Sequence, residues 1–360
     1  MREKIAVIGA GNGGFAMAAD LALDGYKVNL FEFPKFKSNI NSVIETGGVE
    51  ISGPIKTGFS RLNLVTTDLE KAITKCSFIM IVTQANAQDT LADMFVPIIK
   101  PGQTIFLLPG SAGTLLMAKK FREQRVSSEV RLAETVTLPY ICRKIGQNKV
   151  HVERRTGNLG IGTFPGEDID DIFSVFQTMY PDSYKMQNVL EVGLCNTNFI
   201  AHPAPAIMSL SQIEFGKGNF NFYKDGCSPS VEKVITAVNS EIAGILDVLK
   251  FKTISPMAAC EKRFGMTWDE IQEMRKKWDI RVNFDTDKRF FTEDVQVGLV
   301  LISSLGKQFE VPTPVCDSII HLSGIVEETD FWGIGRTAKM LGLHKMNIEE
   351  LNDFLQHGYR

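Results

Sequence analysis

In a glycine-rich turn near the start of the chain, the glycines have the spacing typical of turns that bind a pyrophosphate. The turn, Gly9-Ala10-Gly11-Asn12-Gly13-Gly14, follows the apolar run Ile5 to Ile8 and opens a segment with helical periodicity. In the pattern G-x-G-x-x-G, Gly9 allows the tight turn, Gly11 lets backbone approach the phosphates, and Gly14 lets the helix pack close to the sheet. The first amides of the helix then face the anion. We interpret the whole turn as a dinucleotide-binding site, with a purely structural turn as the alternative.

Glu32 strengthens this interpretation and indicates which dinucleotide binds. It stands at the end of the next expected strand, Lys27 to Phe31, near the spacing of roughly 20 residues typical of the carboxylate that holds a ribose 2′-hydroxyl. This acid favours NAD over NADP. Lys35 and Lys37 follow it and are able to pair with a 2′-phosphate, so NADP stays the alternative.

Thr83 is a further candidate for contact with the cofactor. It follows the apolar run Phe78 to Val82, which we expect to be a buried strand. The carboxyl ends of parallel strands face the ligand crevice, so Thr83 is predicted to border the cofactor. A helix cap that satisfies free amides explains the same residue equally well.

The second half of the chain contains a histidine in a setting that suits proton transfer. If the segment before Pro203 is helical, Asn198 and His202 lie one turn apart on one face, and the prolines end or kink the helix beside the imidazole. Hydride reduction of a carbonyl or imine needs proton delivery, and histidine titrates near neutral pH. A lone histidine is also often a structural hydrogen-bonding residue, and the residues alone leave both readings open.

The segment Arg289 to Val295, RFFTEDV, carries a pair of acids at an expected helix start. We expect Thr292 to cap the helix and Glu293 and Asp294 to lie in its first turn. A carboxylate such as Asp294 can orient an imidazole and stabilise its charged form. An ordinary acid that stabilises the positive end of a helix is the alternative.

The candidate cofactor residues and the candidate catalytic residues lie in segments with two different predicted folds. Strand and helix patterns alternate up to about residue 185, which predicts a doubly wound parallel α/β Rossmann sheet for residues 1–185. Residues 186–360 are predicted to form an all-α domain. Its clearest helix begins at Ser228-Pro229 and carries apolar residues at three-four spacing as far as Leu249. Two capping boxes are expected, at Thr267 with Glu270 and at Asn347 with Glu350.

Composition excludes several classes of protein. The 360 residues are 44% hydrophobic and 22% charged, as in ordinary globular domains. A net charge of -3 and a pI near 6.0 offer no electrostatic attraction to nucleic acid or an anionic membrane. The first strand begins almost at the N-terminus and no apolar run approaches the length of a membrane span, so we expect a cytoplasmic protein.

No metal site is expected from the cysteines or histidines. The six cysteines are scattered without a C-x-x-C pair, and the five histidines show neither H-x-x-x-H nor H-E-x-x-H spacing. We interpret the cysteines as small buried hydrophobic residues or idle thiols.

Four segments together resemble the opine dehydrogenases of the octopine/nopaline type. They are the turn G-A-G-N-G-G, the segment L-P-Y-I-C-R at Leu138 to Arg143, the N-x-x-x-H-P at Asn198 to Pro203, and R-F-F-T-E-D-V at Arg289 to Val295. The glycine turn is shared with many dehydrogenases, whereas the last two segments at this separation are much more specific. The resemblance covers nearly the whole chain in the same order.

The resemblance implies an activity and roles for particular residues. Members of this family reductively condense a 2-oxo acid with the amino group of an amino acid, using NADH or NADPH. Their catalytic histidine falls on His202 and its carboxylate partner on Asp294. Asn198 is expected to bind the substrate or the nicotinamide amide. Arg143 is preferred over Arg281 and Arg289 for the substrate carboxylate, because arginine holds both oxygens of such a group.

Other functions stay open at this point. A 2-hydroxy acid or 3-hydroxy acid dehydrogenase has a similar two-domain plan, and a non-catalytic nucleotide-sensing protein retains the same dinucleotide fold. The identity of the two substrates depends on pocket shape, which short motifs do not encode. The helical domain is also a candidate for the face of a homodimer.

Overall fold

The chain folds into two compact units, which a computed structural model describes at residues 3–127, 129–284 and 288–359. The first unit comprises Met1–Val189 and Gln356–Gly358, and the second comprises Leu190–Leu355 and Tyr359. The sequence predicts a division after residue 185, close to the end of the first unit at Val189.

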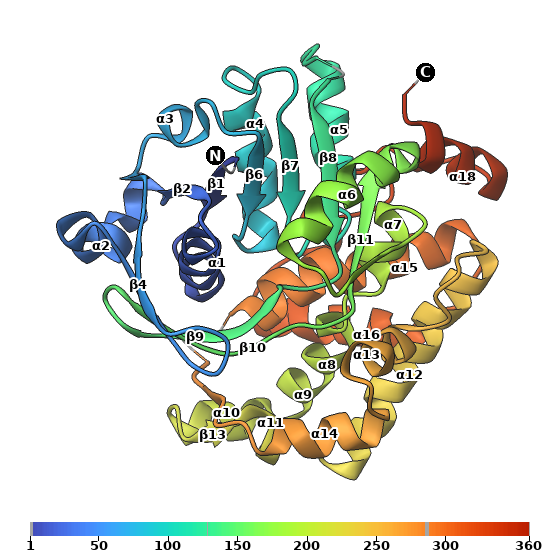
Figure 1. The fold of residues 1–360 in the computed structure, drawn as a ribbon. Helices are drawn as coiled ribbons and strands as arrows, with labels where there is room; N and C mark the ends of the chain where they lie inside the picture. The colour runs from blue at the N-terminus through green and yellow to red at the C-terminus, as the bar shows by residue number, and fades with distance from the viewer. Residues whose placement is uncertain (1–2, 128, 285–287, 360) are drawn as a thin grey trace. The chain divides into compact units, whose positions relative to one another are not determined.

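An eight-stranded sheet forms the centre of the first unit (Figure 1). Its order is β12-β11-β8-β7-β6-β1-β2-β5, and all neighbours pair in parallel except β8 and β11. The predicted doubly wound, mainly parallel Rossmann sheet is confirmed. The strands are β1 (Lys4–Ile8), β2 (Lys27–Phe31), β5 (Leu64–Thr66), β6 (Phe78–Ile81), β7 (Thr104–Leu107), β8 (Arg131–Thr135), β11 (Leu159–Phe164) and β12 (Ser183–Lys185).

The strand order reverses between β1 and β6, which creates the crevice where such sheets bind ligands. From β1 the chain proceeds outward to β2 on one side, and β6 begins the other side. Both β1 and β6 are buried on both faces, apart from the first residue of β1, because helices cover the sheet. The residues that follow these two strands, Gly9 and Thr83, therefore lie at the crevice.

A second, four-stranded sheet packs against the helix that follows the glycine turn. Its order is β4-β3-β10-β9, with β3 (Gly48–Ser52), β4 (Gly58–Arg61), β9 (Tyr140–Gly146) and β10 (Lys149–Arg155). Helix α1 (Asn12–Leu23) contacts all four strands as well as β1 and β2, and in Figure 1 β9 and β10 pass beneath it. The sequence from Gly47 to Thr66 is typical of an inserted hairpin or loop beside the sheet, but it does not predict that β9 and β10 complete a sheet with β3 and β4.

A buried ion pair joins α1 to this second sheet. Asp20 of α1 is 1% exposed and accepts hydrogen bonds from Arg155 of β10, at 2.6 Å, and from the hydroxyl of Tyr140. Lys56 also lies within 2.6 Å of it. Burial alone would raise the pKa of Asp20, but these donors outweigh burial and lower it. The carboxylate therefore stays charged and anchors the second sheet to the helix of the glycine turn.

The remaining helices of the first unit flank the main sheet. They are η1 (Pro34–Ile40), α2 (Asn41–Thr46), α3 (Leu69–Ile73), η2 (Ala85–Ala87), α4 (Gln88–Phe95), α5 (Gly113–Glu123), η3 (Gly166–Asp168) and α6 (Ile169–Met179).

The second unit is helical, as predicted, apart from a ladder of two residues per strand between β13 (Phe220–Asn221) and β14 (Arg281–Val282). Helix α7 (Val189–Leu194) begins at the boundary. The others are α8 (Asn198–Ala201), α9 (Pro203–Met208), α10 (Leu210–Gly216), α11 (Phe222–Gly226), α12 (Pro229–Val248), α13 (Pro256–Phe264), α14 (Trp268–Lys276), the π-helix η4 (Phe290–Leu299), α15 (Val300–Gln308), α16 (Pro314–Val326), α17 (Phe331–Ile334) and α18 (Ile348–His357).

Three of the predicted helix starts in this unit are confirmed. Ser228 caps α12 by accepting a hydrogen bond from the Val231 amide, and Thr267 forms a complete capping box with Glu270. Asn347 and Glu350 exchange the same pair of hydrogen bonds at the start of α18. Within the described residues, no helix is long and apolar enough to cross a bilayer.

Candidate active site

The backbone of the glycine turn has a conformation and a close packing that side chains at Gly9 and Gly14 would prevent. Gly9 has a φ of +104°, in the region that favours glycine. A β-carbon on Gly14 would lie 1.7 Å from the carbonyl oxygen of Gly9, so only glycine lets the start of α1 approach β1. A β-carbon on Gly11 would meet no atom within 4 Å. The space in front of Gly11 is therefore open, as a pyrophosphate at the start of a helix requires.

Thr83 lies beside this turn, where the sequence predicts a cofactor contact. A β-carbon on Gly9 would lie 3.0 Å from the Thr83 methyl group. The hydroxyl oxygen of Thr83 is buried and has no hydrogen-bond partner among the described residues. Buried hydroxyls normally have a partner, so this orphaned group fits a site that a polar ligand completes.

Glu32 follows β2 and turns its carboxylate toward the glycine turn. It is 5% exposed, and it accepts hydrogen bonds from the backbone amides of Ala10, at 3.3 Å, and Phe33, at 2.9 Å. The side chain of Asn39 donates a third bond at 3.1 Å. A carboxylate has about four lone-pair positions, so one is still available to a ribose hydroxyl. Lys35 and Lys37 are exposed on η1.

A lysine that the sequence does not single out also reaches the turn. Lys144 of β9 places its ammonium group 3.4 Å from the carbonyl oxygen of Ala10, and its backbone amide donates to the Asn12 side chain at 2.8 Å. Burial lowers the pKa of Lys144, and the nearby Glu32 opposes that change. No sequence signal marks this residue, because its position depends on how β9 crosses α1. A β-carbon on Gly13 would lie 2.8 Å from the side chain of Leu138, which shortly precedes β9.

His202 and Asp294 form a buried pair in the second unit. The Nδ1 of His202 lies 2.8 Å from Oδ2 of Asp294, and the two residues are 3% and 2% exposed. A carboxylate only accepts hydrogen bonds, so Nδ1 carries the hydrogen and donates it. This is the orientation in which a carboxylate selects the tautomer of an imidazole and stabilises its charged form.

The break between two helices positions His202. Helix α8 ends at Ala201 and α9 begins at Pro203, so His202 lies at the junction, with its amide still bonded to the Asn198 carbonyl at 3.0 Å. The kink predicted at the prolines is confirmed. Proline has no amide hydrogen to continue α8, and it is well suited to the first turn of α9.

A glycine lets the helix that carries Asp294 approach α8. A β-carbon on Gly298 of η4 would lie 2.3 Å from the ring of Phe199 in α8. This close contact lets η4, which carries Asp294, pack against α8, which ends beside His202. The predicted role of Thr292 as a cap is wrong. Its hydroxyl donates to the carbonyl of Lys288, since helical structure begins before Thr292.

Burial and nearby charges set the protonation of His202. Burial lowers its pKa below the ordinary value, Asp294 raises it, and the cations Arg289 and Arg275 lower it further. The net direction is downward. The imidazole is therefore neutral near pH 7 and is able to accept a proton.

Tyr223 is a second residue that sequence reasoning missed. Its hydroxyl lies 3.1 Å from Nε2, the other nitrogen of His202. Tyr223 belongs to the short helix α11, whose sequence carries no recognisable motif. Only the packing of α11 against α9, which follows His202, brings the two side chains together.

The two predicted substrate residues have different surroundings. Asn198 opens α8, and its half-buried side-chain amide has no hydrogen-bond partner in the described part of the chain. Arg143 is exposed on β9 of the first unit, and no described carboxylate forms an ion pair with it. Arg281 pairs with Asp279 at 2.9 Å, and Arg289 is exposed beside the ring of Phe290.

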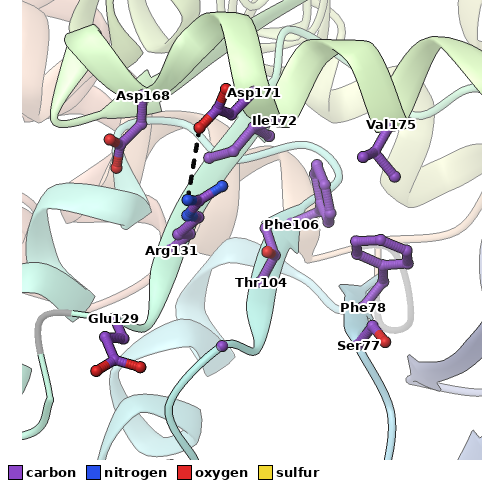
Figure 2. A pocket seen from close by; sticks show the side chains of 11 residues that line it. Ser77, Phe78, Thr104, Phe106, Glu129, Arg131, Asp168, Asp171, Ile172 and Val175 are labelled. Atoms are coloured by element: carbon purple, nitrogen blue, oxygen red, sulfur yellow. Dashed lines mark ion pairs between the residues drawn. The ribbon is translucent and has the colours of Figure 1, made fainter.

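The first unit also has a cavity of about 550 Å³ away from the glycine turn (Figure 2). It is lined at the amino ends of β6, β7 and β8 and by α6, where Arg131 and Asp171 form an ion pair at 3.5 Å. The glycine turn follows the carboxyl end of β1. The cavity therefore lies at the opposite edge of the sheet from the predicted dinucleotide site.

The part of the chain that the structure describes has no metal cluster. No group of three or more histidine, cysteine, aspartate or glutamate side chains in it is placed to hold a metal ion. All six cysteines are free, and five of them are buried. Burial raises the pKa of Cys76 to about 11 and of Cys227 to about 12, which makes these thiols unreactive at neutral pH.

Comparison with known proteins finds similarity to opine dehydrogenases in both units. Residues 185–326 match the family model described as NAD/NADP octopine/nopaline dehydrogenase, alpha-helical domain. An opine dehydrogenase from Arthrobacter sp. (strain 1C) is 29% identical over 345 residues, which cover 95% of each chain. A vitopine synthase from Allorhizobium ampelinum is 26% identical over 362 residues, covering 98% of this chain and 99% of its own.

The fold agrees with these relatives. An octopine dehydrogenase solved in complex with NADH and agmatine matches with a TM-score of 0.75 at 17% identity, over 100% of this chain and 99% of its own. At such low identity the match concerns the fold. The helical-domain match and the relatives that extend over almost the whole length make the chain similar to opine dehydrogenases.

Proposed function

We propose that this protein uses NADH or NADPH to condense a 2-oxo acid reductively with the amino group of an amino acid. The observation that carries the proposal is the buried His202–Asp294 pair, in a chain whose Rossmann unit has an open glycine turn. Its relatives named opine dehydrogenase and vitopine synthase match almost its full length.

The residues of the first unit fit a nicotinamide dinucleotide. The amides at the start of α1 would hold the pyrophosphate in front of Gly11, and Lys144 would balance part of its charge. Thr83 would give its orphaned hydroxyl to the cofactor. Glu32 would accept a hydrogen bond from a ribose hydroxyl, which favours NAD, with NADP as the alternative. When bound, the reduced dinucleotide supplies the hydride.

His202 is proposed as the acid and base of the reaction. Condensation of the oxo acid with the amine releases water, and the product gains one hydride and one proton. A neutral His202 would take a proton from the substrate ammonium and return it to the departing hydroxyl. Asp294 would hold the ring and stabilise the imidazolium. Asn198, whose side-chain amide is half-buried, and Arg143 are proposed to bind polar groups of the substrates.

A screen of substrate pairs tests the proposed reaction. NADH oxidation is measured with a panel of 2-oxo acids, each with and without a panel of amino acids. We expect oxidation only when both substrates are present. Oxidation that an amine does not affect would instead favour a hydroxy acid dehydrogenase. Binding of NADH without oxidation in any pair would favour a nucleotide-sensing protein.

The variant His202→Ala tests the role of the imidazole. General acid and base catalysis contributes on the order of 10²- to 10⁴-fold, so we expect a loss of turnover of that size. NADH affinity should be unchanged, because His202 lies in the second unit. His321→Ala removes an exposed histidine of α16 and serves as the control. Equal weakening of NADH binding and turnover would remove His202 from the acid and base role.

We also propose a cytoplasmic location and a homodimer. Helices α16 and α17 pack together and expose Leu322, Ile325 and Ile334 to solvent. Exposed apolar side chains that gather on adjacent helices are typical of interaction surfaces. Light scattering of the purified protein tests the dimer, and Ile325→Glu should shift the mass to that of a monomer.

A further inference from the structure

Tyr223 occupies the second nitrogen of the His202 ring. Its hydroxyl lies 3.1 Å from Nε2, while Nδ1 is bonded to Asp294 at 2.8 Å. Both ring nitrogens therefore have partners within the protein. A proton that leaves or enters the imidazole has to pass through Tyr223 or through the carboxylate.

The direction of these hydrogen bonds follows from the chemistry of the groups. Asp294 only accepts, so Nδ1 carries the hydrogen and the neutral ring offers a lone pair at Nε2. The Tyr223 hydroxyl therefore donates to Nε2. Burial raises the pKa of Tyr223, opposed by Arg275 and Arg289, so its hydroxyl keeps its hydrogen at neutral pH. The three groups form a continuous path from Asp294 to the tyrosine oxygen.

Exposure to solvent increases along this path. Asp294 is 2% exposed, His202 is 3% exposed and Tyr223 is 9% exposed. The rings of Phe222 and Phe290 cover the imidazole, with centroids 5.8 and 5.3 Å from it. The tyrosine is therefore the most exposed of these three buried residues.

Neighbouring side chains hold the tyrosine ring and favour its charged form. The ring of Trp278 meets it edge-on at 5.7 Å, and the guanidinium of Arg275 lies 5.6 Å from its centre. Arg275 is 6% exposed, and no described carboxylate lies within ion-pair distance of it. Its Nε also has no hydrogen-bond partner among the described residues. A buried cation without a carboxylate stabilises negative charge that develops nearby.

We propose that Tyr223 is a catalytic residue whose hydroxyl carries protons between the substrate amine and Nε2 of His202. This inference rests on the proposed function, because it assigns the group that touches the substrate in that reaction.

The relay balances in both directions. As the substrate ammonium loses a proton to the tyrosine oxygen, the hydroxyl proton moves to Nε2, and the imidazolium that forms is paired with Asp294. One N–H bond of the substrate breaks and one forms on His202, while Tyr223 ends as it began. The same steps in reverse give a proton to the hydroxyl that departs as water. No oxidant or reductant takes part in this transfer.

The variant Tyr223→Phe tests the relay in the full-length protein. It removes only the hydroxyl and keeps the ring against Trp278 and Arg275. We expect kcat to fall at least tenfold, while the dissociation constant of NADH and the thermal midpoint stay unchanged. The pH dependence of kcat should also change, because the relay then lacks one of its titrating groups. A purely structural role would leave that profile unchanged.

A matched control variant and the wild-type enzyme distinguish failure of the relay from failure of the proposed function. Tyr180→Phe removes another buried hydroxyl, which bonds to that of Tyr140 in the first unit at 3.0 Å, and should leave kcat unchanged. If the wild type turns over and Tyr223→Phe matches it in kcat and in pH profile, the relay is wrong and the proposed function stands. If no substrate pair supports NADH oxidation by the wild type, both the relay and the proposed function are wrong.

Discussion

Asp294 determines which nitrogen of His202 carries a hydrogen. The two residues are 92 positions apart in the chain, yet their side chains lie 2.8 Å apart in a nearly solvent-free environment. In such surroundings an electrostatic interaction is stronger than in water, so the carboxylate has a large effect on the ring. Two consequences follow, one for the rate and one for its pH dependence.

Asp294→Asn should lower kcat by about 10²- to 10⁴-fold, because the amide neither fixes the tautomer nor stabilises the imidazolium. Asp294 raises the pKa of His202 against the lowering caused by burial. Its removal lowers that pKa further, so the ring stays neutral to a lower pH. The acid limb of the profile of kcat/KM against pH should therefore shift to lower pH. Glu293→Gln, at the adjacent position, is the control, and an unmoved acid limb would contradict the pairing.

Glu32→Ala should weaken NADH binding more than NADPH binding. The wild-type carboxylate accepts a hydrogen bond from a ribose hydroxyl but repels a 2′-phosphate at the same position. Fluorescence titration of both dinucleotides measures the change. Glu45→Ala removes an exposed acid of α2 and should leave both affinities unchanged. An equal loss for the two dinucleotides would mean that another residue holds the ribose.

At the scale of elements, close approach of helices and strands builds the glycine turn of the first unit and the His202–Asp294 pair of the second. Gly14 lets α1 begin against β1, and Gly298 lets η4 pack on the ring of Phe199. The π-helix that contains Gly298 is itself unusual, since such turns are rare and occur frequently at functional sites. Here it carries the carboxylate that pairs with His202.

Gly298→Ala should therefore lower kcat by roughly tenfold or more without changing NADH affinity. The added β-carbon would lie 2.3 Å from the Phe199 ring, so η4 must move away from α8. A 1 Å displacement of a catalytic group is able to cost about 10²-fold in rate. Gly216→Ala is the matched control, because its β-carbon would meet Phe220 at an ordinary 3.4 Å. Unchanged kcat in Gly298→Ala would show that the pair tolerates the shift.

At the scale of the whole molecule, the candidate site residues are divided between two compact units. The first carries the glycine turn, Glu32, Thr83 and Lys144, all of which suit the cofactor. The second carries His202 and Asp294, with Tyr223. We thus expect the named residues of the first unit to affect binding of the dinucleotide, and His202, Asp294 and Tyr223 to affect proton transfer.

NADH should stabilise the folded protein through the first unit alone. A ligand at one hundred times its dissociation constant adds about 2.7 kcal/mol to the free energy of unfolding, which raises the thermal midpoint. The same gain is expected in His202→Ala when the ligand is at the same multiple of its dissociation constant. Differential scanning calorimetry with and without NADH measures it. Loss of the shift in His202→Ala would contradict the division between the units.

The main features of the fold were predictable because they depend on local sequence. Apolar runs such as Ile5 to Ile8 and helix starts such as Ser228-Pro229 are determined by neighbouring residues. Strand β12, three residues long, and the pairing of β9 with β10 and then β3 carry little local signal. Thr292 shows the limit of predicting helix starts from local sequence. Its residue type suits a helix cap, but in the structure it lies inside a helix that begins earlier.

By itself the sequence determined the dinucleotide turn, because its glycines act through backbone conformation within six residues. It also identified His202 and Asp294 as candidates through the family resemblance, without establishing that they touch. Only the tertiary structure decided that contact, since it depends on how η4 packs against α8. The same is true of Lys144 at the glycine turn and of Tyr223 on Nε2, because long-range packing, rather than any motif, determines which side chains become neighbours.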